Sequence, residues 1–297
     1  MVNEIDLRGI IEQVLKEMNL SDSSASEIIK EAQTRISAAT VIEDGCLPDV
    51  TEVDIRKQYL VENPVNRDAY YELKQYAPCR LGIGKAGARY KTDPSLQFRA
   101  AHSAAQDAVF SDVDQSFIDN MGFFTVQTLC DSKDIYLTRP DLGKKLNEEG
   151  IKTVLEKCRK NPTVQIYVSD GLSSAAVAAN VADVLPGIMQ GLKSYGIDVG
   201  TPFFCKYGRV GAMDHISELT GATVTCVLIG ERPGLITAQS MSAYIAYKAT
   251  VGMPEARRTV VSNIHKEGTI PAEAGAHISE IIKTILENKA SGTDLKL

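Results

Sequence analysis

The chain has 297 residues, 44% of them hydrophobic, which is enough for the core of one large domain or two ordinary ones. The formal net charge of −6 and the isoelectric point near 5.4 argue against a general nucleic-acid-binding protein, because contact with phosphates needs a basic face. No apolar run approaches the roughly 20 residues that cross a bilayer, and the N-terminus lacks the pattern of a secretion signal, so we expect no membrane and no nucleic-acid partner.

The cysteines and histidines do not indicate a cross-linked or metal-binding protein. The six cysteines include no CxxC pair, so we expect neither a disulfide framework nor a zinc site, and a reducing, cytoplasmic location fits best. The four histidines lack a metal-ligand spacing such as HExxH. The sequence therefore predicts no protein-ligated metal.

Residues 1–20 carry the pattern of a short amphipathic helix. Apolar side chains recur at helical spacing from Leu7 to Met18, and Asp6 is a candidate N-cap. Residues 21–60 follow as a polar linker and a modest helix over 27–37. The first helix could pack on its own domain, or it could dock on a partner, because an apolar stripe before a linker stays exposed unless another surface covers it.

A mainly helical domain is expected over residues 61–160. The pattern predicts helices over 54–76 with a break near Asn63-Pro64, over 94–110 and over 144–160, a strand over 122–130 and an extended piece over 135–138.

The stretch from Gly82 to Gly87 in this domain matches GxGxxG. We do not interpret it as a dinucleotide fingerprint, because no apolar strand precedes it and no apolar helix follows it. The basic side chains around its glycines leave two interpretations open, an anion site or a contact surface for another subunit.

Residues 161–297 have the pattern of an α/β fold. Apolar runs over 163–168, 202–205 and 223–229 predict strands, and each ends in a polar or glycine-rich loop. Further elements are expected as helices over 175–184, 186–195, 213–219 and 237–247, a strand over 258–263 and a final helix from Pro271. We therefore predict a doubly wound, mostly parallel, Rossmann-like sheet in the C-terminal half, after a mainly helical N-terminal region.

The three loops after these strands form the candidate ligand site. The carboxyl ends of parallel strands lie at one edge of a sheet, where helix N-termini also point, so the loops at 169–174, 206–211 and 230–234 should converge. In the first loop, Ser169, Asp170 and Gly171 could cradle a phosphate or a nucleotide tail, or they could simply begin a capped helix.

The other two loops carry charged side chains with equally open roles. Lys206 and Arg209 could donate hydrogen bonds to amides or to a phosphate, or they could remain solvated in a surface loop. Glu231 could meet a polar ligand or pair with Arg232, and His265 could be an acid or base or a hydrogen-bonded structural residue. No Ser–His–Asp order or paired-carboxylate motif stands out, so we expect a ligand-binding domain without catalytic residues of its own.

Seven separated blocks resemble the small subunit of ethanolamine ammonia-lyase, in the order that this family shows. The resemblance covers roughly residue 61 to the end of the chain. The blocks are Gly84–Arg89, Tyr136–Asp141, Val168–Ser173, Gly200–Phe204, Tyr207–Val210, Gly230–Leu235 and Ser262–His265. The resemblance implies an enzyme that uses adenosylcobalamin to convert ethanolamine to acetaldehyde and ammonia.

The resemblance also implies how the work is shared between subunits. The cobalamin would lie between this subunit and a larger, barrel-shaped subunit that carries the substrate-binding residues. Homolysis of the cobalt–carbon bond would give an adenosyl radical that takes a hydrogen from the substrate, and amino migration and loss of ammonia would follow. The small subunit would thus complete the site rather than catalyse alone.

Matched position by position, Val210, Glu231 and Val260 resemble the cobalamin contacts of the family, and Arg209 is a neighbour of these contacts. The family often has cysteine where Val260 stands, so an apolar contact would replace a sulfur contact. The helix of residues 1–20 resembles the family's extension that enters ethanolamine-utilisation microcompartments. This implies a location in the cytoplasm, inside a bacterial microcompartment, with a shell or cargo partner.

Two other functions stay open on the sequence. A stand-alone nucleotide-binding enzyme would use the same sheet edge and give the Gly82 loop a role. A scaffold protein would make the N-terminal helix the active part and tolerate changes in the strand-end loops.

Overall fold

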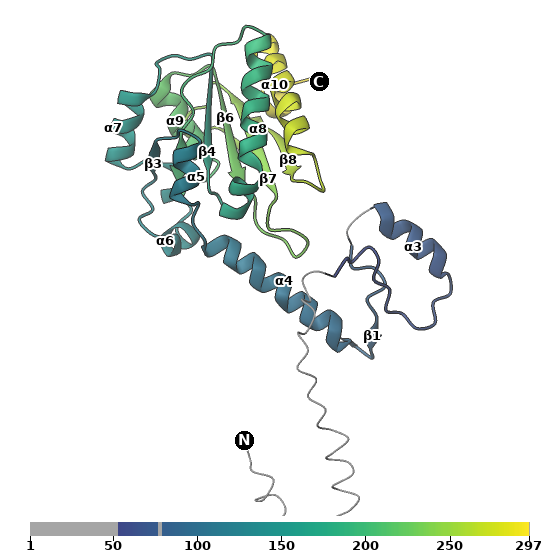
Figure 1. Ribbon diagram of the computed structural model, residues 1–297. Helices are drawn as coiled ribbons and strands as arrows, with labels where there is room; N and C mark the ends of the chain where they lie inside the picture. Colours follow the sequence, from purple (N-terminus) through teal and green to yellow (C-terminus); the bar gives the residue numbers. More distant parts are fainter. Residues whose placement is uncertain (1–52, 77–78, 297) are drawn as a thin grey trace, which may run out of the picture. The chain divides into compact units, whose positions relative to one another are not determined.

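The computed structural model describes residues 53–76 and 79–296 (Figure 1). They belong to one compact unit, residues 50–297. The helices expected over 1–20 and 27–37 lie outside the described residues.

The centre of the described unit is a six-stranded sheet with the strand order β3-β5-β4-β6-β7-β8 (Figure 1). The first four strands in this order are parallel to one another, and β7 is antiparallel to both of its neighbours, β6 and β8. The prediction of an α/β fold with a mostly parallel sheet is therefore confirmed. The strands are β3 (Thr125–Gln127), β4 (Val164–Ser169), β5 (Phe204–Lys206), β6 (Val224–Gly230), β7 (Met241–Tyr247) and β8 (Thr259–Ile264).

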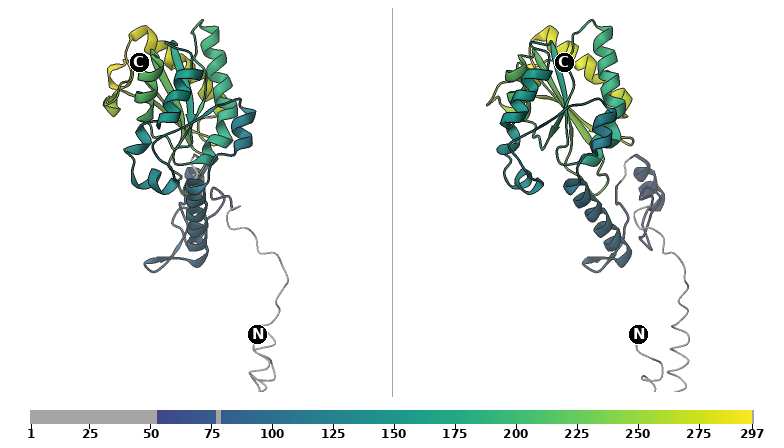
Figure 2. Two further views of the ribbon diagram at one scale, coloured as in Figure 1. Left: turned by 90° about the vertical axis from the view of Figure 1, so that its left-hand side faces the viewer. Right: turned by 60° about the vertical axis from the view of Figure 1, so that its left-hand side comes forward.

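Helices cover both faces of the sheet (Figure 2). On one face, α8 (Ser174–Ser194) and α10 (Pro271–Asn288) pack against each other and against the strands. On the other face lie α7 (Glu148–Lys157) and α9 (Ala212–Thr220). The central strands β4 and β6 are buried along their whole length, which explains their unbroken apolar sequence.

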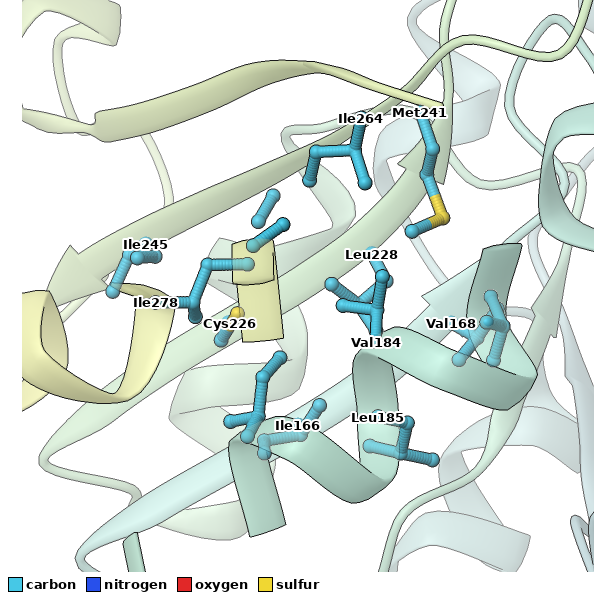
Figure 3. Packing of buried hydrophobic residues seen from close by; sticks show 14 of the residues in the cluster. Ile166, Val168, Val184, Leu185, Cys226, Leu228, Met241, Ile245, Ile264 and Ile278 are labelled. Carbon is cyan, nitrogen blue, oxygen red and sulfur yellow. The ribbon is translucent and has the colours of Figure 1, made fainter. Parts of the chain in front are cut away.

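Alternate side chains of a central strand enter different cores. Ile166 and Val168 of β4 face Val184 of α8 in the first core, which Figure 3 shows together with Ile278 of α10. Tyr167, between them in sequence, belongs to the second core on the opposite face. The two cores hold β4 and β6 rigidly, and these are the strands whose carboxyl ends carry the candidate site.

The helix α8 runs unbroken through Pro186, although the sequence predicts two helices that meet there. Its close packing on α10 compensates for the lost backbone hydrogen bond. Gly187 lies so near Gly275 that an added methyl group would stand 3.2 Å from the Cα atom of Gly275. Among the described residues, α8 alone is long and apolar enough to cross a membrane by length and composition, and its buried face makes it a core helix here.

The part before the sheet contains α3 (Arg67–Tyr76), the hairpin β1 (Lys85–Ala86) and β2 (Arg89–Tyr90), α4 (Thr92–Phe110) and α5 (Gln115–Asn120). The helix from 92 to 110 agrees with the prediction. The GxGxxG stretch enters the hairpin, and Gly82, Gly84 and Gly87 all have positive φ angles. The sequence analysis was therefore right to exclude a dinucleotide fingerprint here, because this stretch is not a strand-to-helix turn.

Several predicted elements are wrong. The run 237–247 is not a helix, because its second half forms β7, which pairs with β6 and β8. The stretch 135–138 lies in the helix α6 (Lys133–Thr138), which Ser132 caps, and no helix begins before Arg67 among residues 53–76. The strand expected over 122–130 is shorter in the structure, where only β3 forms. β3 belongs to the central sheet, although it lies in the part of the chain that was expected to be a mainly helical domain. Short 3₁₀ helices are η1 (Leu142–Lys144), η2 (Glu255–Arg257) and η3 (Gly292–Asp294).

Candidate functional site

The three polar loops converge at the carboxyl ends of β4, β5 and β6, as predicted. The backbone amide of Tyr207 donates to Oδ2 of Asp170 at 3.0 Å, which ties the loop after β5 to the loop after β4. The amide of Leu172 donates to the carbonyl oxygen of Gly230 at 3.1 Å, which ties the same loop to the end of β6. Hydrogen bonds therefore hold the three loops together at this edge of the sheet.

The loop after β4 uses its polar groups inside the protein. Ser169 and Asp170 are buried, and the hydroxyl of Ser169 donates to the carbonyl oxygen of Cys205 at 2.8 Å. The amide of Gly171 donates to Oδ1 of Asp170 at 3.0 Å. Ser173, rather than these residues, caps α8 by accepting from the amide of Ala176 at 3.1 Å. The polar groups of this loop therefore bind other parts of the protein, and they hold the neighbouring loops in position.

Asp170 is a buried carboxylate with a distant positive partner. The Nζ atom of Lys133 lies 3.9 Å from its Oδ2 atom, and neither side chain reaches solvent to a significant extent. Burial raises the pKa of Asp170 to about 6, although Lys133 and the hydrogen bonds from Tyr207 and Ser169 oppose the rise. The charge of Asp170 is thus balanced inside the protein.

Arg209 is held against the helix α6. Its Nη2 atom donates to the carbonyl oxygen of Tyr136 at 2.7 Å, and its guanidinium carbon lies 4.1 Å from the centre of the Tyr136 ring. Its backbone amide donates to the carbonyl oxygen of Gly143. Lys206 pairs with Asp112 at 3.0 Å. Both cations of this loop therefore have partners within the chain, and Arg209 fixes the backbone that leads into Val210.

Glu231 presents an anchored, half-buried carboxylate at the end of β6. The hydroxyl of Ser240 donates to Oε2 at 2.8 Å, and Oε1 accepts from the hydroxyl of Ser242 and from the backbone amide of Asn263 at 3.1 Å. Burial tends to raise the pKa of Glu231, but these hydrogen bonds and nearby His265 outweigh it, so the pKa lies below its usual value. The carboxylate is therefore ionised, and its partners are these groups rather than Arg232.

Tyr244 and Val260 are neighbours on the face of the sheet that α9 covers in part, whereas Val210 lies in the loop after β5, on the other side of β4, β6 and β7 from β8. Val260 of β8 stands opposite Tyr244 of β7, so the two side chains share this face. Tyr244 and Val210 both pack against the second core, and the charge of Glu231 helps to raise the pKa of Tyr244 after burial, which has the largest effect. Val260 is 44% exposed. The three positions matched to the family thus contribute one anchored carboxylate and two apolar side chains, of which Val260 faces solvent.

Several residues of this arrangement could not be found in the sequence. Ser240, Ser242 and Tyr244 fall in the stretch that was expected to be helical, so their pairing with Glu231 and Val260 was hidden. His265 is hydrogen-bonded within its own loop, since its Nε2 atom lies 2.8 Å from Oδ1 of Asn263 and its Nδ1 atom accepts from the amide of Glu267. Within residues 53–76 and 79–296, no three His, Cys, Asp or Glu side chains gather as a metal site would require.

Comparison with known proteins identifies the family. Residues 67–296 match the family model "Ethanolamine ammonia-lyase light chain (EutC)". The chain is 59% identical to the ethanolamine ammonia-lyase small subunit of Clostridium tetani, over the full length of both chains. It belongs to the ethanolamine ammonia-lyase light-chain family. The small subunits of Clostridium perfringens and Fusobacterium nucleatum are 57% and 54% identical to it, over at least 99% of this chain and all of each relative.

The family assignment confirms the resemblance found in the separated sequence blocks. The matched region begins at Arg67, the first residue of α3, and includes every strand and helix of the sheet domain. As a light chain, the protein is a subunit of an ammonia-lyase, with a large subunit as its counterpart. The alternative of a stand-alone nucleotide-binding enzyme is not favoured, because the matching family and relatives are ethanolamine ammonia-lyase small subunits.

Proposed function

We propose that this chain is the small subunit of an ethanolamine ammonia-lyase and holds adenosylcobalamin against the large subunit. The assembled enzyme would convert ethanolamine to acetaldehyde and ammonia. The observation that carries the proposal is the anchored carboxylate of Glu231 at the carboxyl end of β6, with the exposed apolar side chain of Val260 on the same sheet, opposite Tyr244 of β7.

The three residues matched to the family fit the cofactor by their chemistry. A corrin ring offers broad apolar faces and a rim of amide groups, so it needs apolar contact and hydrogen-bond acceptors from the protein. Val210 and Val260 supply the apolar side chains, and Glu231 supplies the acceptor. When bound, adenosylcobalamin supplies the radical chemistry, and the protein supplies binding and orientation.

The remaining loop residues would hold the binding surface in position rather than contact the cofactor with free side chains. Ser169, Asp170 and Gly171 would support the seat of the nucleotide tail from beneath, through buried and internally hydrogen-bonded groups rather than through free side chains. Arg209 would keep Val210 in place through its bond to Tyr136. These residues would exclude water from the cofactor and hold a preformed surface for it, which lowers the cost of ordering on binding.

We further propose a division of the chain into regions with separate roles. Residues 1–20 would be a targeting helix for a bacterial microcompartment in the cytoplasm, 21–60 a linker and helix, 61–160 a mainly helical domain, and 161–297 a Rossmann-like domain that contacts cobalamin. Deletion of residues 1–20 should leave the activity of the assembled enzyme unchanged and release it from the shell. Unchanged packaging of the truncated enzyme would refute the targeting role.

Activity measurements with separated subunits test the main proposal. Acetaldehyde and ammonia release from ethanolamine and adenosylcobalamin is measured with this chain, with the large subunit, and with both. Activity in the mixture alone supports a shared cofactor site, whereas full activity of the large subunit alone refutes it.

Substitutions of Glu231 and Val260 test whether these residues contact the cofactor. Glu231→Ala and Val260→Asp should raise the KM for adenosylcobalamin, because the first removes an acceptor and the second sets a charge against an apolar ring. Val260→Cys should keep the KM near that of the original enzyme. Val251→Asp is the control, since Val251 is a similarly exposed valine in the connection between β7 and β8.

A further inference from the structure

The carboxylate of Glu231 is oriented by two other strands rather than by its own loop. Ser240 precedes β7, Ser242 lies within β7 and is 1% exposed, and Asn263 lies on β8. Each donates a hydrogen bond to the carboxylate, and the amide of Glu231 donates to the carbonyl oxygen of Ser240 at 3.0 Å. The side chain therefore cannot turn without breaking bonds to both strands.

These bonds leave the carboxylate with a limited capacity to accept more. A carboxylate has about four lone-pair sites. Oε1 accepts from Ser242 and Asn263, and Oε2 accepts from Ser240. One site remains, on Oε2. The carboxylate keeps its charge, because its three donors are neutral, and the one open site has room for a single further donor, such as an amide N–H or a hydroxyl.

We infer that Ser240 and Ser242 are positioning residues, which with the amide of Asn263 orient Glu231 so that Oε2 accepts one neutral N–H or O–H group of the cofactor. This inference rests on the proposed function. The cofactor has such donors in its amide groups and hydroxyls. The serines touch Glu231 and act through it.

The test uses the assembled enzyme with its large subunit, and measures the KM for adenosylcobalamin, the Kd for the same cofactor by equilibrium dialysis without ethanolamine, and the kcat at saturating cofactor. The Kd should change in the same direction and by the same factor as the KM in each variant. Glu231→Gln should raise the KM. Ser242→Ala should raise it about tenfold, which is the loss expected for one hydrogen bond to a charged group, and should leave kcat unchanged. Ser240→Ala should act in the same direction.

A matched control separates positioning from loss of structure. Ser291 is also a buried serine that ties down β7, since its hydroxyl accepts from the amide of Tyr247 at 3.0 Å and donates to the carbonyl oxygen of Arg257 at 2.5 Å. It binds the far end of the strand, away from Glu231. Ser291→Ala should lower stability without changing the KM for adenosylcobalamin.

The double variant Glu231→Gln/Ser242→Ala decides whether Ser242 acts through Glu231. If it does, the KM of the double variant equals that of Glu231→Gln alone. Additive effects, or a Ser242→Ala enzyme that behaves like Ser291→Ala, would overturn the inference while leaving the proposed cofactor site intact. An unchanged KM in Glu231→Gln would remove Glu231 from the cofactor site, and the inference would fail with it.

Discussion

Asp170 at the end of β4 accepts a hydrogen bond from the backbone amide of Tyr207 at 3.0 Å, and so one buried side chain holds two loops of the ligand edge together. Its charge is balanced by Lys133, whose Nζ atom lies 3.9 Å away. Asp170→Asn should lower the free energy of unfolding by about 1–3 kcal/mol, because one of the two oxygens that accept from the backbone amides of Gly171 and Tyr207 becomes an NH2 group, which cannot accept.

A double-mutant cycle measures this pair. Urea unfolding of Asp170→Asn, Lys133→Met and the double variant should give a coupling energy of about 1–3 kcal/mol. The pair Lys152–Glu156 is the control, because it has the same separation of 3.9 Å on the exposed side of α7. Its coupling should stay below about 0.5 kcal/mol. Equal coupling in the two pairs would contradict the role assigned to burial.

The pH dependence of stability gives a second prediction about Asp170. Burial raises its pKa to about 6 in the folded state, from a usual value of 3.8, so the folded protein binds this proton at a higher pH than the unfolded chain does. The contribution of Asp170 to stability is therefore fully present below about pH 4 and is lost as the pH rises through 6. The difference in unfolding free energy between the original protein and Asp170→Asn, measured by urea unfolding from pH 4 to 7, should grow as the pH falls. A difference that is constant over this range would show that the carboxylate keeps its usual pKa.

The sequence predicts the elements with continuous apolar runs or clear helical spacing well, and it predicts β7 wrongly. The strands β4 and β6 and the helices α4, α9 and α10 follow from apolar runs and helical spacing, which are local signals. β7 was missed because its serines, alanines and methionine resemble a helix, and its strand conformation depends on pairing with β6 and β8.

The candidate site could also be predicted only in part from the sequence. The convergence of the loops was predicted because the carboxyl ends of parallel strands meet at one edge of a sheet, and Val210, Glu231 and Val260 came from the family resemblance. The burial of Ser169 and Asp170 and the bonds from Ser240 and Ser242 to Glu231 depend on which strands are neighbours and in which register, and the sequence does not contain this information locally.

Gly230 should be intolerant of any side chain. A methyl group on it would stand 2.1 Å from the carbonyl oxygen of Ser173 and 2.6 Å from that of Asp170, both of which are backbone atoms that cannot move aside. Gly230→Ala should therefore lower the free energy of unfolding by more than about 2 kcal/mol or prevent folding. Gly234→Ala in the same loop is the control, since its nearest neighbour would be 3.9 Å away, and it should change stability by less than about 0.5 kcal/mol. Thermal unfolding of the two variants measures the contrast, and similar melting temperatures would contradict it.

The start of β8 is fixed by a buried ion pair between two elements. Arg258 precedes the strand, and its Nη2 atom donates to both carboxylate oxygens of Asp214 on α9, at 2.9 and 2.8 Å. The side chains are 1% and 8% exposed. Asp214→Ala should lower the free energy of unfolding by about 3–5 kcal/mol, because the guanidinium of Arg258 would stay buried with only the exposed Glu255 as its partner.

The same substitution should reach the proposed cofactor site, because Val260 follows Arg258 by two residues on β8. We expect Asp214→Ala, if it assembles with the large subunit, to raise the KM for adenosylcobalamin. Asp294→Ala is the matched control, since Asp294 pairs with the neighbouring Arg257 at 3.3 Å and both side chains are 57% exposed. This exposed pair should contribute less than about 1 kcal/mol, and its loss should leave the KM unchanged. If Asp214→Ala lowered stability and the KM stayed constant, the position of Val260 would not depend on this ion pair, and the link between α9 and the cofactor face would be refuted.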